Sequence, residues 1–108
     1  MVFDQETADR ADPLISVTIK TILHLKKIFG DQTVIDLPAG ATLSELLSIM
    51  ADRWGDEFAT NILQPGKSTT LPHIRLLING RDIAFLNRFE TRLNDEDEVM
   101  ILPPVAGG

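Results

Sequence analysis

The last three residues of the chain, Ala106-Gly107-Gly108, are those whose types most clearly suggest chemistry. They carry almost no side chain, so the main chain and its terminal carboxylate can enter a channel too narrow for other residues. A terminal carboxyl group has a pKa of roughly 3.3 to 3.7, so at neutral pH Gly108 ends in an anion, a poor electrophile. Chemistry at Gly108 therefore requires activation of the carboxylate. The alternative is a frayed end without function, as many termini are.

The residues before this tail predict a strand followed by an extended arm. Val99 to Leu102 is short, apolar and β-rich, as in a buried strand. Pro103 and Pro104 must end it, because proline cannot donate to a ladder and fixes φ near −65°. At roughly 3.3 Å per residue, the segment from Pro103 to Gly108 can project on the order of 20 Å from the fold.

Other catalytic chemistry has little support. The sequence has no cysteine, which excludes a disulfide framework, a thiolate metal site and transport of sulfur as a cysteine persulfide. His24 and His73 have no identifiable orienting partner, so surface or packing roles are favoured. Gly66-Lys67-Ser68 matches the end of a phosphate-binding loop, but that motif needs a glycine where this chain has Asn61. The acidic residues 95–98 lack the spaced ligands and the glycine of a calcium loop, and we interpret them as a solvated turn.

Composition indicates one soluble globular domain. The chain has 108 residues, 44% of them hydrophobic, and a net charge of −6. That charge argues against a nucleic-acid partner and favours basic partner surfaces. Residues 1–13 are acidic and lack the apolar core of a signal peptide, so we interpret them as a flexible extension. No run approaches the length of a membrane span, and we expect a cytoplasmic protein without a membrane partner.

The chain order predicts an α+β fold with a helix on one face of a sheet. Leu14 to Leu25 and Gln32 to Leu37 read as two strands of a hairpin. Thr42-Leu43-Ser44-Glu45 has capping-box spacing and begins a helix with an apolar stripe, which Gly55 should end before a short second helix. The Asn79-Gly80 turn should connect a strand from His73 to a return segment of residues 83–86.

The tail and two of the turns together resemble one known family. The end Leu102-Pro103-Pro104-Val105-Ala106-Gly107-Gly108, the turn Asn79-Gly80-Arg81-Asp82-Ile83 and the segment Leu93-Asn94-Asp95-Glu96-Asp97-Glu98-Val99 are similar to the MoaD family, the small sulfur-carrier subunits of molybdopterin synthase, within the MoaD/ThiS group. The resemblance implies a β-grasp, or ubiquitin-like, mixed sheet whose first and last strands are central and parallel. Residues 14–102 would form this domain and residues 103–108 a protruding tail.

The resemblance also implies a function. Similar proteins are adenylated on the terminal carboxylate by an E1-like adenylyltransferase of the MoeB type, which uses ATP and magnesium. An enzyme carrying a persulfide then supplies sulfur, and the resulting thiocarboxylate acts inside the large synthase subunit, MoaE, to form the dithiolene of molybdopterin. The chain itself would hold no permanent cofactor or metal, and catalytic acids and bases would belong to its partners.

The same resemblance assigns the site residues. Gly108 would carry the adenylate and then the sulfur. The partner-binding set would comprise the narrow neck, the prolines with their neighbours, and an exposed apolar patch on the sheet: Gly107, Ala106, Val105, Pro104, Pro103, Leu102, Ile22 and Ile83. Family members tend to have an aromatic residue at the position of Leu102, so this contact would differ here.

Three other functions remain open from the sequence. The same terminus could carry sulfur to thiamine thiazole or to a tRNA base. It could also join this chain to lysines of other proteins, as a ubiquitin-like modifier does. Finally, the domain could be a binding module with an inert tail.

Overall fold

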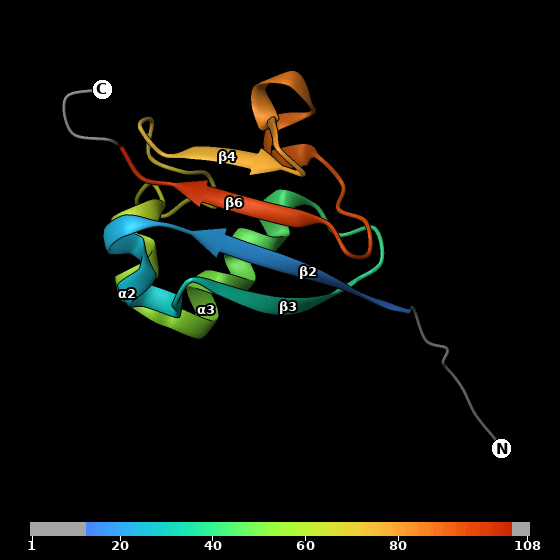
Figure 1. Ribbon diagram of the computed structural model, residues 1–108, viewed down its shortest axis with the longest axis horizontal. Helices are drawn as coiled ribbons and strands as arrows, with labels where there is room; N and C mark the ends of the chain where they lie inside the picture. Colours follow the sequence, from blue (N-terminus) through green and yellow to red (C-terminus); the bar gives the residue numbers. More distant parts are fainter. Residues whose placement is uncertain (1–12, 105–108) are drawn as a thin grey trace, which may run out of the picture.

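The computed structural model describes residues 13–104, and the predictions made for residues 1–12 and 105–108 lie outside this range. The secondary structure elements, in chain order, are strand β2 (Leu14–Thr21), the 3₁₀ helix η1 (Leu23–Leu25), helix α2 (Lys26–Phe29), strand β3 (Gln32–Pro38), helix α3 (Leu43–Ile62), strands β4 (Arg75–Ile78) and β5 (Arg81–Asp82), the 3₁₀ helices η2 (Ile83–Phe85) and η3 (Arg88–Glu90), and strand β6 (Glu98–Leu102). Figure 1 shows that the strands form one sheet and that α3 lies behind it.

The sheet has the strand order β3-β2-β6-β4-β5. β2 and β3 form an antiparallel hairpin, with Val17 opposite Ile35. β6 lies between β2 and β4, parallel to β2 and antiparallel to β4. The predicted β-grasp arrangement, with parallel first and last strands at the centre, is therefore confirmed.

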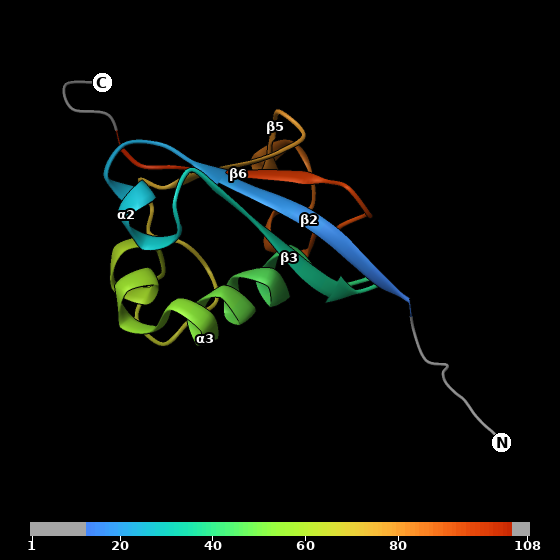
Figure 2. The same cartoon turned by 60° about the horizontal axis from the view of Figure 1, so that its bottom comes forward.

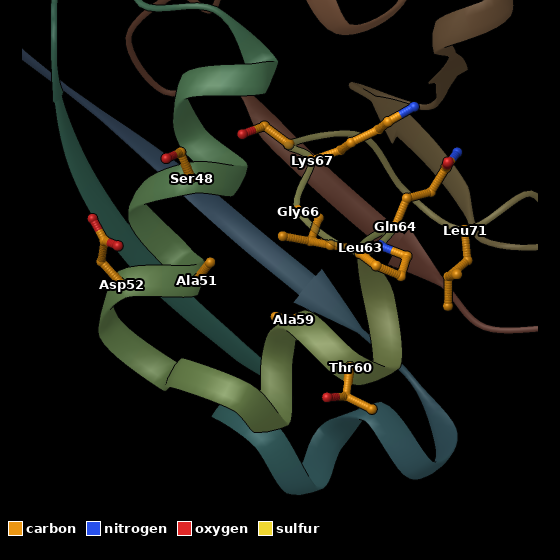
Figure 3. Close-up of a pocket in the computed structure, with 12 residues that line it drawn as sticks. Ser48, Ala51, Asp52, Ala59, Thr60, Leu63, Gln64, Gly66, Lys67 and Leu71 are labelled. Carbon is orange, nitrogen blue, oxygen red and sulfur yellow. The ribbon is translucent and has the colours of Figure 1, made fainter.

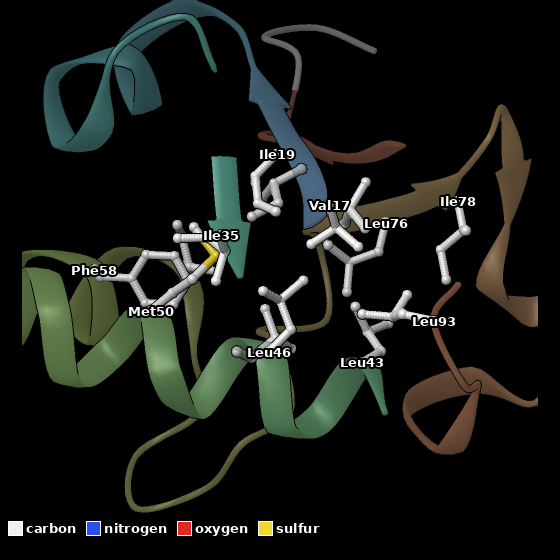
Figure 4. Packing of buried hydrophobic residues seen from close by; sticks show 14 of the residues in the cluster. Val17, Ile19, Ile35, Leu43, Leu46, Met50, Phe58, Leu76, Ile78 and Leu93 are labelled. Carbon is white, nitrogen blue, oxygen red and sulfur yellow. The ribbon is translucent and has the colours of Figure 1, made fainter. Parts of the chain in front are cut away.

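One face of the sheet packs against α3, and none of the helices within residues 13–104 covers the opposite face (Figure 2). Alternation along β2 gives buried Ile15, Val17 and Ile19 on the helix side. Figure 4 shows side chains from the sheet and from α3 meeting in one apolar layer. Its members from the strands and helix include Ile35, Leu76, Ile78, Leu43, Leu46, Met50 and Phe58, and Leu93 joins from the loop before β6.

Helix α3 begins as the sequence predicts. The Thr42 hydroxyl accepts a hydrogen bond from the Glu45 amide at 3.2 Å, and the Glu45 carboxylate accepts one from the Thr42 amide at 2.8 Å. Gly55 then leaves helical geometry, with φ 66° and ψ −147°, and a second helical arm continues to Ile62. The predicted stop at Gly55 is thus a sharp kink, which lets Phe58 and Ile62 on the second arm turn back into the core.

The structure corrects two other expectations. β2 ends at Thr21 rather than Leu25, because the chain reverses at Leu23, whose φ is 57°. After the Asn79-Gly80 turn, the return strand β5 has only two residues. The expected extended segment 83–86 is instead η2 and its C-cap, begun by the Asp82 carboxylate, which accepts a hydrogen bond from the Ala84 amide at 2.9 Å.

Candidate functional site

The candidate site is the point at which the chain leaves the sheet after β6. Val99 and Ile101 are fully buried on the helix face, and the central position of β6 gives it ladder partners on both sides. At the end of the ladder, Leu102 pairs with Arg75 of β4. The direction of the departing segment is therefore set by a strand that the fold holds from both edges.

A buried hydroxyl ties the ends of the two parallel strands together. Thr21, the last residue of β2, pairs with Ile101 and donates a hydrogen bond from Oγ1 to the Ile101 carbonyl oxygen at 2.7 Å. Thr21 occupies the inward position at the end of β2, where the preceding pattern would place an apolar residue. Its hydrogen bond fixes the main chain of β6 at Ile101, two residues before the first of the two prolines.

The two prolines that follow β6 differ in burial. Pro103 is buried and Pro104 is exposed, so the first proline still packs with the fold and the second is the first free residue of the exit. Val105, Ala106, Gly107 and Gly108 lie outside the described residues, and their assigned roles stay predictions.

Two of the three apolar residues assigned to the sheet patch lie together, and the third does not. Ile22 follows Thr21 and Leu102 follows Ile101, so the parallel register places them side by side at the exit. Ile22 is 40% exposed and Leu102 is half-buried. The expectation that Ile83 is exposed is wrong: it is 7% exposed, because η2 turns its side chain into the core.

The uncovered face of the sheet continues from this exit with residues that the sequence reasoning missed. Met100 pairs with Lys20 on one side and Leu77 on the other. Both Met100 and Leu77 are half-buried, and the Lys20 ammonium forms an ion pair with Glu98 at 3.1 Å. The alternation of β6 around its buried Val99 and Ile101 is the signal that would have found them.

In the acidic turn before β6, Asp95 and Glu96 are exposed, but the interpretation of the turn as solvated is wrong for Asp97. Asp97 is 8% exposed. Its carboxylate accepts hydrogen bonds from the Asn79 side chain and from the Asn94 amide, both at 2.8 Å. Asp95 accepts one from the Ser16 amide at 2.8 Å, which joins the turn to β2. The carboxylates therefore anchor the start of the strand that leads to the site.

A cavity beside α3 does not match a phosphate site. It has a volume of about 450 Å³ and lies between the two arms of α3 and the loop of residues 64–70 (Figure 3). Gly66-Lys67-Ser68 lines it, but the loop's amides bond within the loop: Lys67 to the Gln64 carbonyl oxygen at 3.0 Å and Gln64 to the Thr69 carbonyl oxygen at 2.8 Å. The loop leads to a strand rather than a helix, so it lacks the cradle of amides that binds phosphate.

Other site types find no support in the part of the chain that the structure describes. Within residues 13–104, no group of three or more histidine or acidic side chains is arranged to hold a metal ion. His24 and His73 are both exposed. Over the same residues, the longest helix, α3, is not apolar enough to cross a bilayer.

Comparison with known proteins shows to which class of protein this chain is similar. The model of the ThiS family matches residues 23–108. Small archaeal modifier protein 3 of Haloferax volcanii is 35% identical over 68 residues, which are 63% of this chain and 71% of the relative. A protein of Archaeoglobus fulgidus, provisionally named a sulfur carrier, is 30% identical over 67 residues, or 62% and 74% of the two chains.

A solved structure agrees with these relatives. The solution structure of small archaeal modifier protein 1 from Methanosarcina acetivorans has a TM-score of 0.72 at 26% identity, covering 89% of this chain and 99% of that one. The fold and its exit thus define a ubiquitin-like sulfur carrier or modifier. The chain belongs to the ThiS family. Proteins of this class work with partner enzymes such as E1-like activators.

Proposed function

We propose that this chain carries sulfur as a thiocarboxylate on Gly108 and delivers it to the pyranopterin precursor of molybdopterin. The observation that supports the proposal is the exit geometry: a central strand, paired on both edges, brings the chain to the exposed Pro104, after which the sequence continues as Val-Ala-Gly-Gly. Such an arm holds a reactive terminus at a fixed distance from a docked domain, which supplies the positioning that a transfer reaction needs.

The chemistry follows from the terminal carboxylate. One of its oxygens attacks the α-phosphate of ATP in the activating enzyme, pyrophosphate leaves, and an acyl-adenylate forms on Gly108. The terminal sulfur of a donor persulfide then attacks the carbonyl carbon and AMP leaves. A second thiol of the donor cleaves the resulting acyl disulfide, which releases the thiocarboxylate and leaves a disulfide on the donor. Magnesium and ATP belong to the activating partner.

This chain contributes position rather than acid–base catalysis. It has no cysteine and therefore no persulfide of its own. Both of its histidines are exposed and lie outside β6, the strand that leads to the exit. The proposed partners are an E1-like adenylyltransferase of the MoeB type, a persulfide enzyme and a large synthase subunit of the MoaE type.

A second candidate function is supported by the relatives. Two of the similar proteins are named small archaeal modifier proteins. The same acyl-adenylate on Gly108, attacked by a lysine amine instead of a persulfide, would join this chain to another protein through an amide bond. Both functions need the same free arm and the same activation.

Intact mass of the protein purified from its own source separates these outcomes. Replacement of one oxygen by sulfur, located on Gly108 by fragmentation, supports the carrier. Conjugates of higher mass in which trypsin leaves the C-terminal peptide of residues 93–108, the part after the last arginine, attached to a lysine support the modifier. A terminus that stays unmodified, and that the adenylating enzyme of the same organism does not activate with ATP, contradicts both.

A further inference from the structure

In the turn that follows β2, a leucine has both an unfavourable backbone conformation and an exposed side chain. Leu23 has φ 57°, in the left-handed region that side chains with a Cβ adopt reluctantly. The side chain is also 56% exposed. Glycine or asparagine would suit this backbone better, and a polar side chain would suit this exposure better. Leu23 therefore serves neither the turn nor the core, and such strained positions cluster at binding sites.

Leu23 lies next to the exit of the C-terminal segment. The Thr21 hydrogen bond to Ile101 brings the end of β2 against the end of β6, so Ile22 follows beside Leu102 and the turn at Leu23 begins one residue further along. Figures 1 and 2 both show the turn after β2 beside the end of β6. We call Ile22, Leu23 and Leu102 the exit collar; it is an apolar surface around the point where the chain leaves the domain.

The tail itself carries little information that a partner could read. Gly107 and Gly108 have no side chain, so an enzyme that accepts them would accept many other small-residue termini. Only six residues, about 20 Å when extended, separate Leu102 from the terminal carboxylate. An enzyme that brings Gly108 to ATP must therefore approach the exit collar, where exposed apolar side chains can provide selectivity.

The charges around the collar define the surface that would fit it. Arg75 lies opposite Leu102 and forms an ion pair with Asp82 at 3.2 Å. Lys26 forms one with Asp31 at 3.0 Å. Lys27 is exposed, and none of the ion pairs among residues 13–104 includes it. The rim is thus neutral to weakly basic, which matches an apolar pocket with a few carboxylates at its edge.

We infer that Leu23 is a specificity residue: its side chain enters an apolar pocket of the enzyme that adenylates Gly108, and the strain of its backbone is retained for that contact. This inference rests on the proposed activation of Gly108. It extends that proposal by assigning recognition of the carrier to a residue outside the tail.

The test compares the full-length wild type with Leu23→Asn in ATP–pyrophosphate exchange catalysed by the purified E1-like adenylating enzyme of the same organism. Asparagine has as many side-chain heavy atoms as leucine, branched at the same carbon, and tolerates a left-handed backbone. We expect KM for the carrier to rise about tenfold or more, as for a truncated interface anchor, with kcat little changed and the melting temperature equal or higher. Unchanged KM, or a clear loss of thermal stability, would overturn the inference.

Two variants make the result specific. Glu96→Gly relieves a left-handed backbone, φ 69°, in the turn before β6, and should leave KM unchanged. Phe85→Asn removes an apolar side chain that is 81% exposed and belongs to η2, and should also leave KM unchanged. An equal rise of KM in either would overturn a specific role of Leu23.

Deletion of Gly108 separates this inference from the proposed function. If the deletion abolishes exchange while Leu23→Asn has no effect, the inference fails and the proposed activation stands. If the chain lacking Gly108 is still activated, the proposed function itself fails.

Discussion

Asn79 and Asp97 are joined by a hydrogen bond of 2.8 Å from Asn79 Nδ2 to Asp97 Oδ1. Asn79 also exchanges two hydrogen bonds with Glu98: its amide donates to the Glu98 carbonyl oxygen at 2.8 Å, and its Oδ1 accepts from the Glu98 amide at 2.9 Å. The Asn-Gly turn and the acidic turn, which look like separate motifs in the sequence, are thus one unit that fixes the start of β6.

Replacement of the buried carboxylate should destabilise this unit. In Asp97→Ala, the Asn79 side chain and the Asn94 amide lose their acceptor in a partly buried site. We expect the free energy of unfolding to fall by about 2 kcal/mol, measured by urea denaturation. Glu57→Ala removes the same charge from an exposed helical position and should have little effect. A loss as large in Glu57→Ala would attribute the effect to net charge instead.

Gly55→Ala should also destabilise the fold. No atom within 4 Å would touch the added Cβ, so the cost is backbone strain alone, at φ 66° and ψ −147°. We expect a loss of about 1–3 kcal/mol in the free energy of unfolding. Thr60→Ala, an exposed change on the second arm of α3, is the control. Equal stability of Gly55→Ala and the wild type would mean that the kink does not depend on glycine.

Changes in the tail should separate activation from folding. We expect deletion of Gly108, or Gly107→Val, to abolish adenylation, because the activated carbonyl is displaced or the narrow neck is widened. The melting temperature, followed by circular dichroism, should stay that of the wild type. A large loss of folding stability in either variant would contradict the prediction that the arm is free of the domain.

Asp82 gives the hairpin edge a dependence on pH. The hydrogen bond from the Ala84 amide, helped by the Arg75 guanidinium, holds the pKa of the Asp82 carboxyl group below its ordinary value. A carboxyl group with a lowered pKa in the folded state stabilises the fold above its unfolded pKa of about 3.9, and that stabilisation is lost as pH falls through the folded pKa. Asp82→Asn should therefore be less stable than the wild type at pH 7, by under about 1 kcal/mol at this partly exposed site.

The check is urea denaturation of both proteins at pH 7 and at a series of acid values. The difference in unfolding free energy between wild type and Asp82→Asn should narrow once pH falls below about 4. A difference that stays constant across this range would show that Asp82 contributes packing rather than charge.

Much of the local structure could be predicted from the sequence because its causes are local. The capping box of Thr42 and Glu45, the helical arm that ends at Gly55 and the Asn79-Gly80 turn each depend on residues a few positions apart. The order of the strands could not be predicted from local patterns, because the parallel pairing of β2 and β6 joins segments about eighty residues apart, such as Thr21 and Ile101. That pairing came from the resemblance to a family, not from periodicity.

The prediction of a reactive end needed no structure: a terminus almost without side chains after two prolines, in a chain with no cysteine, points to the carboxylate of Gly108 as the group to be activated. Which residues surround the exit depended on the folded structure. It buried Ile83 and Asp97, and it placed Ile22 beside Leu102 with the strained Leu23 in the adjoining turn. Each residue type has its own side-chain chemistry, whereas the exposure of a side chain depends on which distant segments pack against it.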